Sequence, residues 1–252
     1  MVDLASRLSR PPDAAVGRAP WPGHEYARGW GVFGLPFDTG HVLALRVFPQ
    51  SSFGPYRTVW HRTPEGRWSI HVDGPRPDLA CPRYYGPACE SIGTARVRLA
   101  FTGPATLHVT MDRPALDWVL TARATPVLAA MNAVSCVLPL VTWRMRALVR
   151  AREQAARALG LGDIRMRGRM PSGHEGILMP QRMYYVTDAA AFLDDVDLGG
   201  PVRLSRSPRI GTVALPARGI LAVGQAAWQI QDPTEHTPSR VDARWDGKSG
   251  DR

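Results

Sequence analysis

Residues 126–162 divide the chain into two segments that are rich in predicted β-strands. This stretch is almost wholly apolar from 127 to 143 and rich in arginine after that, which is typical of helices. Pro139 interrupts the first helix, because proline lacks the amide hydrogen that a helix interior needs. Short runs of β-branched and aromatic residues, bounded by glycine and proline, lie on both sides. The predicted fold class is therefore mainly β, with antiparallel sheet in two β-rich halves and a helical insert between them.

The predicted boundaries follow changes in composition along the chain. Residues 23–125 form the first β-rich half, residues 126–162 the helical insert and residues 163–231 the second β-rich half. Residues 1–22 and 232–252 are polar, contain prolines and show no periodicity. We expect both ends to be flexible tails.

The clearest hairpin in the sequence joins residues 56–62 to residues 67–73. Pro64 presets the backbone angle φ of the turn between them, and Gly66 supplies a positive φ. A second hairpin is expected between residues 95 and 111, followed by a strand at 116–122. Strands joined by such short turns pair in antiparallel fashion, and closing the sheet would remove its exposed edges.

The scarcity of lysine excludes one large class of enzymes. The chain has 31 basic and 22 acidic residues, and its only lysine is Lys248, close to the C-terminus. Schiff-base chemistry requires a lysine whose pKa is lowered by burial or by a cationic neighbour, and a terminal Asp-Gly-Lys-Ser-Gly segment is a poor candidate. Lysine-dependent decarboxylases, aldolases and pyridoxal phosphate enzymes are therefore not expected.

The cysteines and the N-terminus predict a cytoplasmic protein. Cys81, Cys89 and Cys136 are odd in number and form no recognisable pattern, so free thiols are expected. The first residues contain no apolar run before Pro11 and Pro12, unlike a signal peptide.

No cofactor and no metal are expected. Glycines 29, 31 and 34 match the spacing of a dinucleotide-binding loop, but residues 35–40 cannot begin the helix that such a loop requires. Glycines that allow close packing of strands or a bend are the preferred explanation. The seven histidines show no paired zinc-binding spacing, and no cysteine pair completes a zinc set.

Candidate catalytic residues come from the first hairpin. Its turn places His61 and His71 on neighbouring strands, and Asp73 lies two residues beyond His71. A histidine beside a carboxylate can transfer protons near neutral pH, so these three residues are a candidate acid–base group. The alternative is that the histidines are partly buried, hydrogen-bonded structural residues.

A second group of candidates lies in the loop 81–87. Tyr84 and Tyr85 could donate a proton or a hydrogen bond to a carbonyl group, and Arg83 could stabilise negative charge. Packing of the aromatic rings onto the sheet is the alternative. His174, in a glycine-rich turn before a strand, is expected either to line the mouth of a pocket or to belong to a polar turn.

Trp60 and Trp118 lie in predicted strands, where aromatic side chains line apolar ligand pockets or fill cores. We include both as candidate substrate-binding residues, together with Arg83 and His174.

The arginine-rich part of the helical insert allows two further partners. An apolar helix followed by Arg144, Arg146 and Arg150 could lie on an anionic membrane surface, although a core helix with a solvated arginine face is preferred. The same arginines would attract nucleic acid, but no recognition fold accompanies them, so no nucleic-acid partner is expected.

Four stretches carry a resemblance to known sequences: residues 33–49, 59–70, 81–85 and 197–199. Together they resemble a family of uncharacterised actinobacterial proteins with no assigned activity. More distantly, the layout is similar to lipocalin-like proteins related to hydroxyneurosporene synthase, which include carotenoid hydratases and cofactor-free cyclases of secondary metabolism. This resemblance implies one or two lipocalin-like barrels around an apolar cavity. It implies no specific active residues.

The expected function is binding of a hydrophobic small molecule in a β-barrel cavity, with cofactor-independent acid–base chemistry such as cyclisation, hydration or isomerisation. In that hypothesis His61, His71 and Asp73 exchange protons, while Tyr84, Tyr85 and Arg83 orient the substrate. Two alternatives stay open: a non-catalytic carrier of an apolar ligand, and a membrane-peripheral protein that docks through residues 127–157. The sequence leaves the oligomeric state open.

Overall fold

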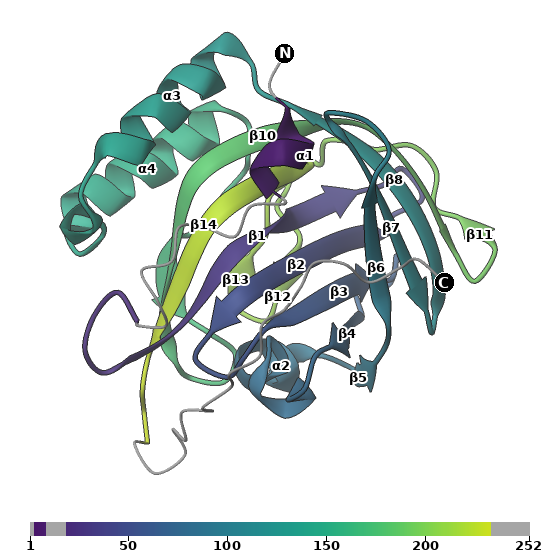
Figure 1. The fold of residues 1–252 in the computed structure, drawn as a ribbon, viewed down its shortest axis with the longest axis horizontal. Coiled ribbons are helices and arrows are strands. Elements are labelled where there is room, and N and C mark those ends of the chain that lie inside the picture. The colour runs from purple at the N-terminus through teal and green to yellow at the C-terminus, as the bar shows by residue number, and fades with distance from the viewer. Residues whose placement is uncertain (1–2, 9–18, 233–252) are drawn as a thin grey trace.

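The computed structural model describes residues 3–8 and 19–232, and the chain in these ranges is mainly β (Figure 1). The strands are β1 (His24–Pro36), β2 (Val42–Ser51), β3 (Tyr56–Arg62), β4 (Trp68–Asp73), β5 (Ser91–Thr94), β6 (Val97–Phe101), β7 (Thr106–Asp112), β8 (Ala115–Arg123), β9 (Arg167–Arg169), β10 (Glu175–Leu193), β11 (Val196–Asp197), β12 (Arg209–Ile210), β13 (Val213–Ala214) and β14 (Ile220–Gln229). The helices are α1 (Leu4–Leu8), η1 (Pro77–Leu79), α2 (Pro82–Tyr85), η2 (Gly86–Ala88), α3 (Pro126–Val137), η3 (Leu140–Trp143) and α4 (Arg146–Ala158).

One 12-stranded sheet contains strands from both β-rich segments, in the order β5-β4-β3-β2-β1-β14-β10-β8-β7-β6, with β9 and β11 paired to β10. Every pair of neighbours is antiparallel except β4 and β5. The predicted antiparallel, mainly β fold is confirmed. The question of one barrel or two is decided in favour of a single curled sheet, because β1 pairs with β14 and β8 with β10.

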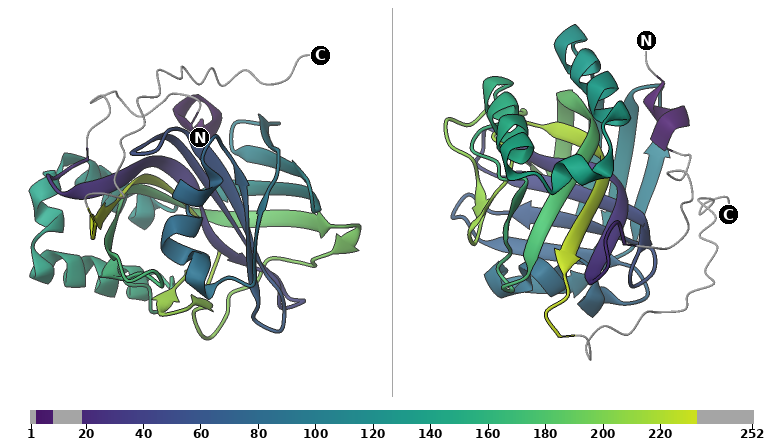
Figure 2. Two further views of the ribbon diagram at one scale, coloured as in Figure 1. Left: turned by 90° about the horizontal axis from the view of Figure 1, so that it is seen from below. Right: turned by 90° about the vertical axis from the view of Figure 1, so that its left-hand side faces the viewer.

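The sheet curls into a half-barrel (Figures 1 and 2). Hydrogen bonds tie its two ends together. Arg57 Nη1 on β3 donates to the Val97 carbonyl oxygen at 2.7 Å, and the Val97 amide donates to Asp73 Oδ2 at 3.0 Å. The Ala95 amide also donates to the Val72 carbonyl at 3.0 Å. Side chains of β3 and β4 thus hold the start of β6, the last strand in the order, beside the strands at the other end of the sheet.

We call the concave side of the sheet the core face, because side chains from both ends of the strand order pack together there. Leu43, Leu45 and Val59 contact the cluster that also contains Leu107 and Trp118. Helix α1 covers this face and buries two leucines of its own. They are Leu4 and Leu8, which are 2% and 7% exposed. The expectation of a flexible N-terminal tail is therefore wrong for residues 4–8, because an apolar pair at helical spacing gains burial on the core face. Residues 9–18 and 233–252, also expected to be flexible, lie outside the described residues.

The opposite side of the sheet, which we call the cavity face, is covered by α2, α3, α4 and the small β12–β13 ribbon (Figures 1 and 2). Two glycines of β1 keep this part of the sheet closely packed. A Cβ atom at Gly29 would collide with the Val47 carbonyl oxygen, and one at Gly31 with the Leu45 carbonyl oxygen. Of the two preferred explanations, close strand packing is confirmed for Gly29 and Gly31.

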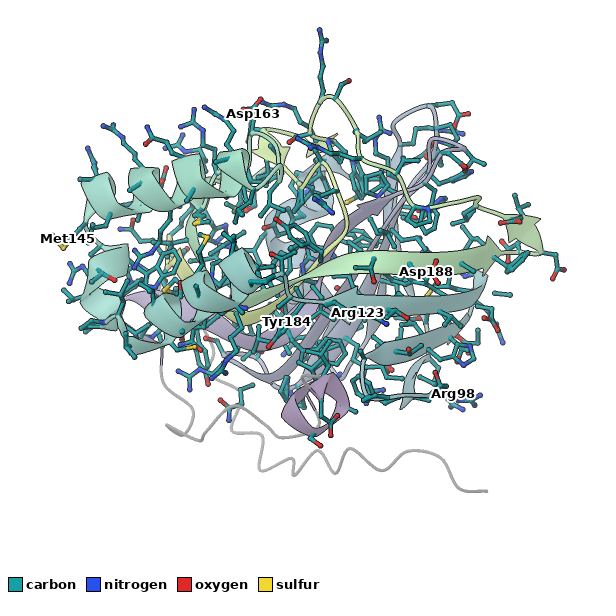
Figure 3. The ribbon with its side chains drawn as sticks, turned by 90° about the horizontal axis from the view of Figure 1, so that it is seen from above. Arg98, Arg123, Met145, Asp163, Tyr184 and Asp188 are labelled. Atoms are coloured by element: carbon teal, nitrogen blue, oxygen red, sulfur yellow. The ribbon has the colours of Figure 1, made fainter. Side chains whose placement is uncertain are left out.

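The helical insert forms a pair of helices on the cavity face (Figure 3). Thr125 Oγ1 caps α3 by accepting from the Leu128 amide at 3.3 Å, and α3 ends before Pro139 as expected. Only Leu128 and Asn132 of α3 are buried, so the helix lies mostly exposed and the expectation of a core helix is wrong. Among the described residues, no helix has the length and apolar character needed to cross a bilayer.

Candidate functional site

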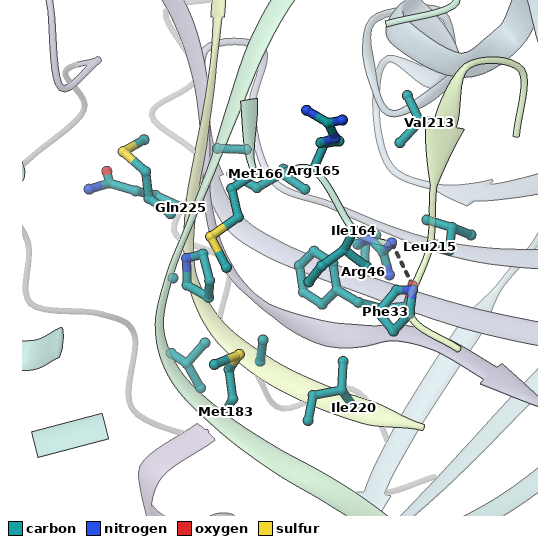
Figure 4. A pocket seen from close by; sticks show the side chains of 18 of the residues that line it. Phe33, Arg46, Ile164, Arg165, Met166, Met183, Val213, Leu215, Ile220 and Gln225 are labelled. Carbon is teal, nitrogen blue, oxygen red and sulfur yellow. Dashed lines mark hydrogen bonds between the residues drawn. The ribbon is translucent and has the colours of Figure 1, made fainter. Parts of the chain in front are cut away.

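An apolar cavity lies on the cavity face between β1, β2, β10, β14 and the loops around residues 161–166 and 213–216 (Figure 4). The volume of the cavity is about 80 Å³. One water requires roughly 10–15 Å³ on this measure, so the cavity is several times larger than a single-water void. Its apolar lining includes Phe33, Phe48, Leu161, Ile164, Met166, Met179, Met183, Leu215 and Ile220.

A break in the pairing of β10 with β14 shapes one wall of the cavity. The register shifts between Pro180 and Arg182, as expected where a proline cannot donate to the ladder. On the facing strand a Cβ atom at Gly224 would collide with the Met179 carbonyl oxygen, so only glycine fits there. Three methionines line the cavity: Met166, Met179 and Met183. Their flexible, polarizable side chains adapt to ligands of varied shape.

Arg46 on β2 brings a charge into this apolar lining. Its side chain lies among Phe33, Ile164 and Leu215 (Figure 4), and the residue is 5% exposed. Nη1 donates to the Val32 carbonyl at 2.6 Å and to the Leu45 carbonyl at 3.0 Å, and Nη2 donates to the Phe33 carbonyl at 3.5 Å. Burial lowers the pKa of Arg46, but a guanidinium remains protonated in proteins.

Aromatic rings stack around the guanidinium group of Arg46. The carbon Cζ lies 4.0 Å from the ring centre of Phe33 and 4.8 Å from that of Trp60. Cation–π contacts of this kind stabilise a desolvated cation by about 2 kcal/mol. Among the described residues no Asp or Glu forms an ion pair with Arg46.

Trp60 and Tyr85, two of the residues predicted from the sequence, line the cavity. Their ring centres are 4.7 Å apart, and the indole nitrogen of Trp60 donates to Thr58 Oγ1 at 2.8 Å. Burial raises the pKa of Tyr85 well above its usual value, and it also raises the pKa of the neighbouring Cys81 thiol. Both groups are therefore neutral near pH 7 and can serve as hydrogen-bond donors rather than as bases.

Arg83 and Tyr84 bind a buried carboxylate behind the cavity. Glu25 on β1 is 0% exposed; it accepts from Arg83 Nε at 3.0 Å, from Arg83 Nη2 at 2.8 Å and from the Tyr84 hydroxyl at 2.5 Å. Tyr84 stacks on Trp228 with ring centres 3.9 Å apart, and Trp228 lines the cavity. His174 packs edge-on against Tyr84 at 5.4 Å. These three predicted residues therefore support the cavity wall, and the described cavity lining does not include them.

The predicted acid–base residues lie on the core face instead. His71 pairs in register with Val59, and His61 follows Val59 by two residues, so all three side chains point to the same side as the core cluster. Trp60 points the other way, into the cavity lining. The sheet itself thus separates His61, His71 and Asp73 from Tyr84 and Tyr85.

The histidines of the core face contact one another. His61 Nε2 lies 2.8 Å from His41 Nδ1, and the two rings stack with centres 5.1 Å apart. Burial, as the largest cause, together with the neighbouring His41 and His71 lowers the pKa of His61 to about 4, while Asp194 opposes the shift. Burial also lowers the pKa of His71. Both imidazoles are neutral near pH 7.

Asp73 and Trp118 have structural roles. Asp73 accepts from the Val97 amide and lies 3.7 Å from Arg57 Nη1, which ties β4 to β6. No hydrogen bond joins Asp73 to His71 among the described residues. Trp118 is fully buried in the core-face cluster and is not among the lining residues of the described cavity.

Sequence reasoning missed Arg46 and Glu25. Arg46 interrupts the apolar run 42–48, and an arginine inside a strand that is apolar on both faces is a signal of a buried charge. Glu25 lies at the start of β1, which was not predicted as a strand because its sequence is rich in glycine. Its pairing with Arg83 could be found only in the folded chain.

Neither a metal site nor a known relative informs the interpretation of the described residues. Within the part of the chain that the structure describes, no group of three or more His, Cys, Asp or Glu side chains could hold a metal ion. No protein-family model, curated protein or solved structure matches the chain. The interpretation of the site therefore rests on its own geometry.

Proposed function

We propose that this protein binds a hydrophobic small molecule in the cavity of its cavity face. The observation that carries the proposal is the cavity itself, which has a volume of about 80 Å³ and walls built mainly from apolar residues. Ligand pockets are typically apolar hollows with a small number of polar groups that fix orientation. Arg46, Tyr85 and Gln225 are polar groups of this kind at the lining.

Binding without turnover is better supported than acid–base catalysis. A general acid or base functions best when its pKa lies near the working pH. The ionisable groups Tyr85 and Cys81 at the cavity have raised pKa values. The histidines that were expected to transfer protons lie on the other face of the sheet. A carrier or sequestering protein therefore suits the geometry best.

A titration with the neutral dye Nile red tests the proposal. We expect saturable fluorescence enhancement with the wild-type protein and at least about tenfold weaker binding with Leu215→Trp, because the larger ring fills the cavity. Val196→Trp is the matched control, since Val196 is 56% exposed on β11. Far-UV circular dichroism checks that both variants fold. No saturable binding to the wild-type protein, or equal binding by the two variants, would refute the proposed cavity function.

A second candidate function, docking to an anionic membrane surface, is favoured by the exposed side of the helix pair. Residues 126–143 contain no charged side chain, and Val137 and Val127 are 79% and 61% exposed. Met145, 52% exposed, lies at the outer end of the pair (Figure 3). Exposed apolar patches of this extent mark interaction surfaces.

Charge complementarity supports an anionic bilayer as the partner. Arg144, Arg146 and Arg150 are exposed directly after the apolar stretch. Arg152 ties α4 to η3, because Nη2 donates to Thr142 Oγ1 at 2.8 Å and the guanidinium stacks 4.0 Å above the Trp143 ring. Basic residues beside an apolar helical face are the combination that holds interfacial helices on anionic lipid.

Liposome flotation tests this second function. We expect the wild-type protein to float with vesicles that contain phosphatidylglycerol and to stay behind with pure phosphatidylcholine. Val137→Asp should abolish flotation, whereas Val196→Asp, the same charge change at an exposed valine of β11, should not. Absence of flotation with the wild-type protein, or equal flotation of both variants, would exclude docking through this surface.

A further inference from the structure

Arg46 is a buried positive charge for which the described chain supplies no carboxylate. The groups that could carry a compensating negative charge are the neighbours Tyr56, Cys81 and Tyr85. Burial raises the pKa of each of them, so all three are neutral at physiological pH. Glu25, the buried carboxylate on the same face, binds Arg83 at 2.8 Å instead.

Burying the Arg46 guanidinium without a carboxylate partner costs free energy, and this cost requires a physical reason. Removing a cation from water is expensive unless it is paired, and an isolated buried charge is among the least favourable groups in a protein. Three backbone carbonyls and two aromatic rings compensate in part. The three hydrogen bonds use three of the five N–H groups of the guanidinium, which leaves donors for another partner.

The lining of the cavity has the same charge bias. Among the described residues it includes two arginines, Arg46 inside and the exposed Arg165 at the rim, and no Asp or Glu. Figure 4 shows Arg165 at the edge of the pocket and Arg46 among the apolar side chains. A molecule that enters the cavity thus meets positive charge and apolar surface together.

We infer that the ligand of this cavity is an amphipathic molecule with an apolar body and a carboxylate that pairs with Arg46. This inference rests on the proposed function, because it assigns the chemistry of the ligand to the same cavity. A carboxylate matches the planar fork of a guanidinium and supplies the missing negative charge. The apolar body contacts the methionine-rich wall, where flexible side chains accept different shapes. Binding is non-covalent, and no group is transferred.

A matched pair of probes separates the charge from the apolar body. Decanoate and decan-1-ol have chains of the same length, and each is measured by displacement of Nile red from the wild-type protein. We expect decanoate to bind at least about tenfold more tightly than the alcohol, because a charge-assisted hydrogen bond in a buried site contributes at least that factor.

Arg46→Met tests whether Arg46 causes this preference. Methionine retains an apolar side chain without the charge, so both probes should bind with affinities within about twofold of each other. Arg98→Met, which removes the same charge from an exposed position on β6, should keep the wild-type preference. Binding of Nile red by Arg46→Met shows that the cavity is intact. If this variant does not fold, the comparison of the two probes on the wild-type protein still decides whether the cavity prefers a carboxylate.

Three results have different meanings. Equal affinities of decanoate and decan-1-ol for the wild-type protein would overturn the carboxylate inference and leave the proposed cavity function standing. An unchanged preference in Arg46→Met would also overturn it. Failure of Nile red, decanoate and decan-1-ol to bind the wild-type protein would instead refute the proposed function itself.

Discussion

Arg46 is buried and Arg83 largely buried on the cavity face, but only Arg83 has a carboxylate partner among the described residues. Arg83 forms a two-point ion pair with the fully buried Glu25, which also accepts from Tyr84. Removing one partner of such a pair destabilises the fold strongly, because the other charge is then left in an apolar environment. The contrast makes Arg83 a structural residue and Arg46 a candidate ligand contact.

Replacing Arg83 should therefore destabilise the protein strongly. We expect Arg83→Met to lower the free energy of unfolding by about 3–5 kcal/mol, measured by urea denaturation, because it leaves the Glu25 carboxylate buried. Arg76→Met is the control: the Arg76–Asp78 ion pair is exposed, and its loss should cost less than about 1 kcal/mol. Equal effects of the two variants would contradict the buried-pair argument.

The core-face histidines predict a dependence of stability on pH. The pKa of His61 is about 4 in the folded state, against an ordinary value of 6.5, so the unfolded chain binds more protons between these pH values. The contribution of His61 is complete above pH 6.5 and is lost as the pH falls towards 4, by up to about 3 kcal/mol.

Urea denaturation at a series of pH values measures this effect. His61→Gln should flatten the loss of stability between pH 6.5 and 4. Ser69→Ala, at the position of β4 that pairs with His61, removes no ionisable group, so it serves as the control and should keep the wild-type slope. If both variants retain the wild-type slope, His61 is not the titrating group.

At the scale of elements, α3 is attached to the sheet by few contacts. Leu128 and Asn132 are its buried side chains, and Cys136 Sγ donates a weak hydrogen bond to the Gln181 carbonyl at 3.7 Å. Asn132 Nδ2 donates to the Met183 carbonyl at 2.9 Å, and the Met183 amide donates to Asn132 Oδ1 at 2.8 Å. A side-chain amide thus completes the backbone hydrogen bonding of β10 next to the shift of register, and Met183 also lines the cavity.

Asn132→Ala should loosen this attachment. Loss of both hydrogen bonds is expected to lower the free energy of unfolding by about 1–3 kcal/mol. It should also speed amide hydrogen exchange in α3 more than in β1 or β14. Ser135→Ala is a control on the same helix, since no side-chain hydrogen bond of Ser135 is found in the described structure. Unchanged exchange in α3 would show that Asn132 does not anchor the helix.

At the scale of the whole molecule, the two β-rich segments depend on each other. β1 lies between β2 and β14, and β10 lies between β14 and β8, so neither segment completes its own part of the sheet. The core-face cluster likewise combines Leu43 and Val59 from the first strands with Tyr184 and Leu221 from the last. Stability in such a sheet is shared rather than divided between the segments.

Unfolding should therefore be one cooperative transition. Tryptophan fluorescence and far-UV circular dichroism are expected to give coincident urea curves, the usual test of two-state behaviour. A fragment of residues 23–125 should not fold alone, because β1 and β8 would lose their partners β14 and β10. Two separate transitions, or a folded fragment, would contradict this prediction.

Local chemistry determined several elements before any tertiary contact is considered. The turn at Pro64 and Gly66 forms the β3–β4 hairpin, with φ of 93° at Gly66. The first helix of the insert ends before Pro139. These features depend on backbone angles and hydrogen-bonding capacity, which a few neighbouring residues set by themselves.

Only the tertiary structure decided which residues share a site. Alternation along a strand places His61 and Trp60 on opposite faces, but it does not tell which face will be covered by helices and which by the returning strands β6–β8. That choice depends on the pairing of β1 with β14, nearly 200 residues apart in register, such as Arg28 with Gln225. The same long-range pairing buried Arg46 in the apolar cavity and joined Glu25 to Arg83. The sequence by itself thus determined a mainly antiparallel β protein with a helical insert, and long-range packing decided where its cavity and its charges lie.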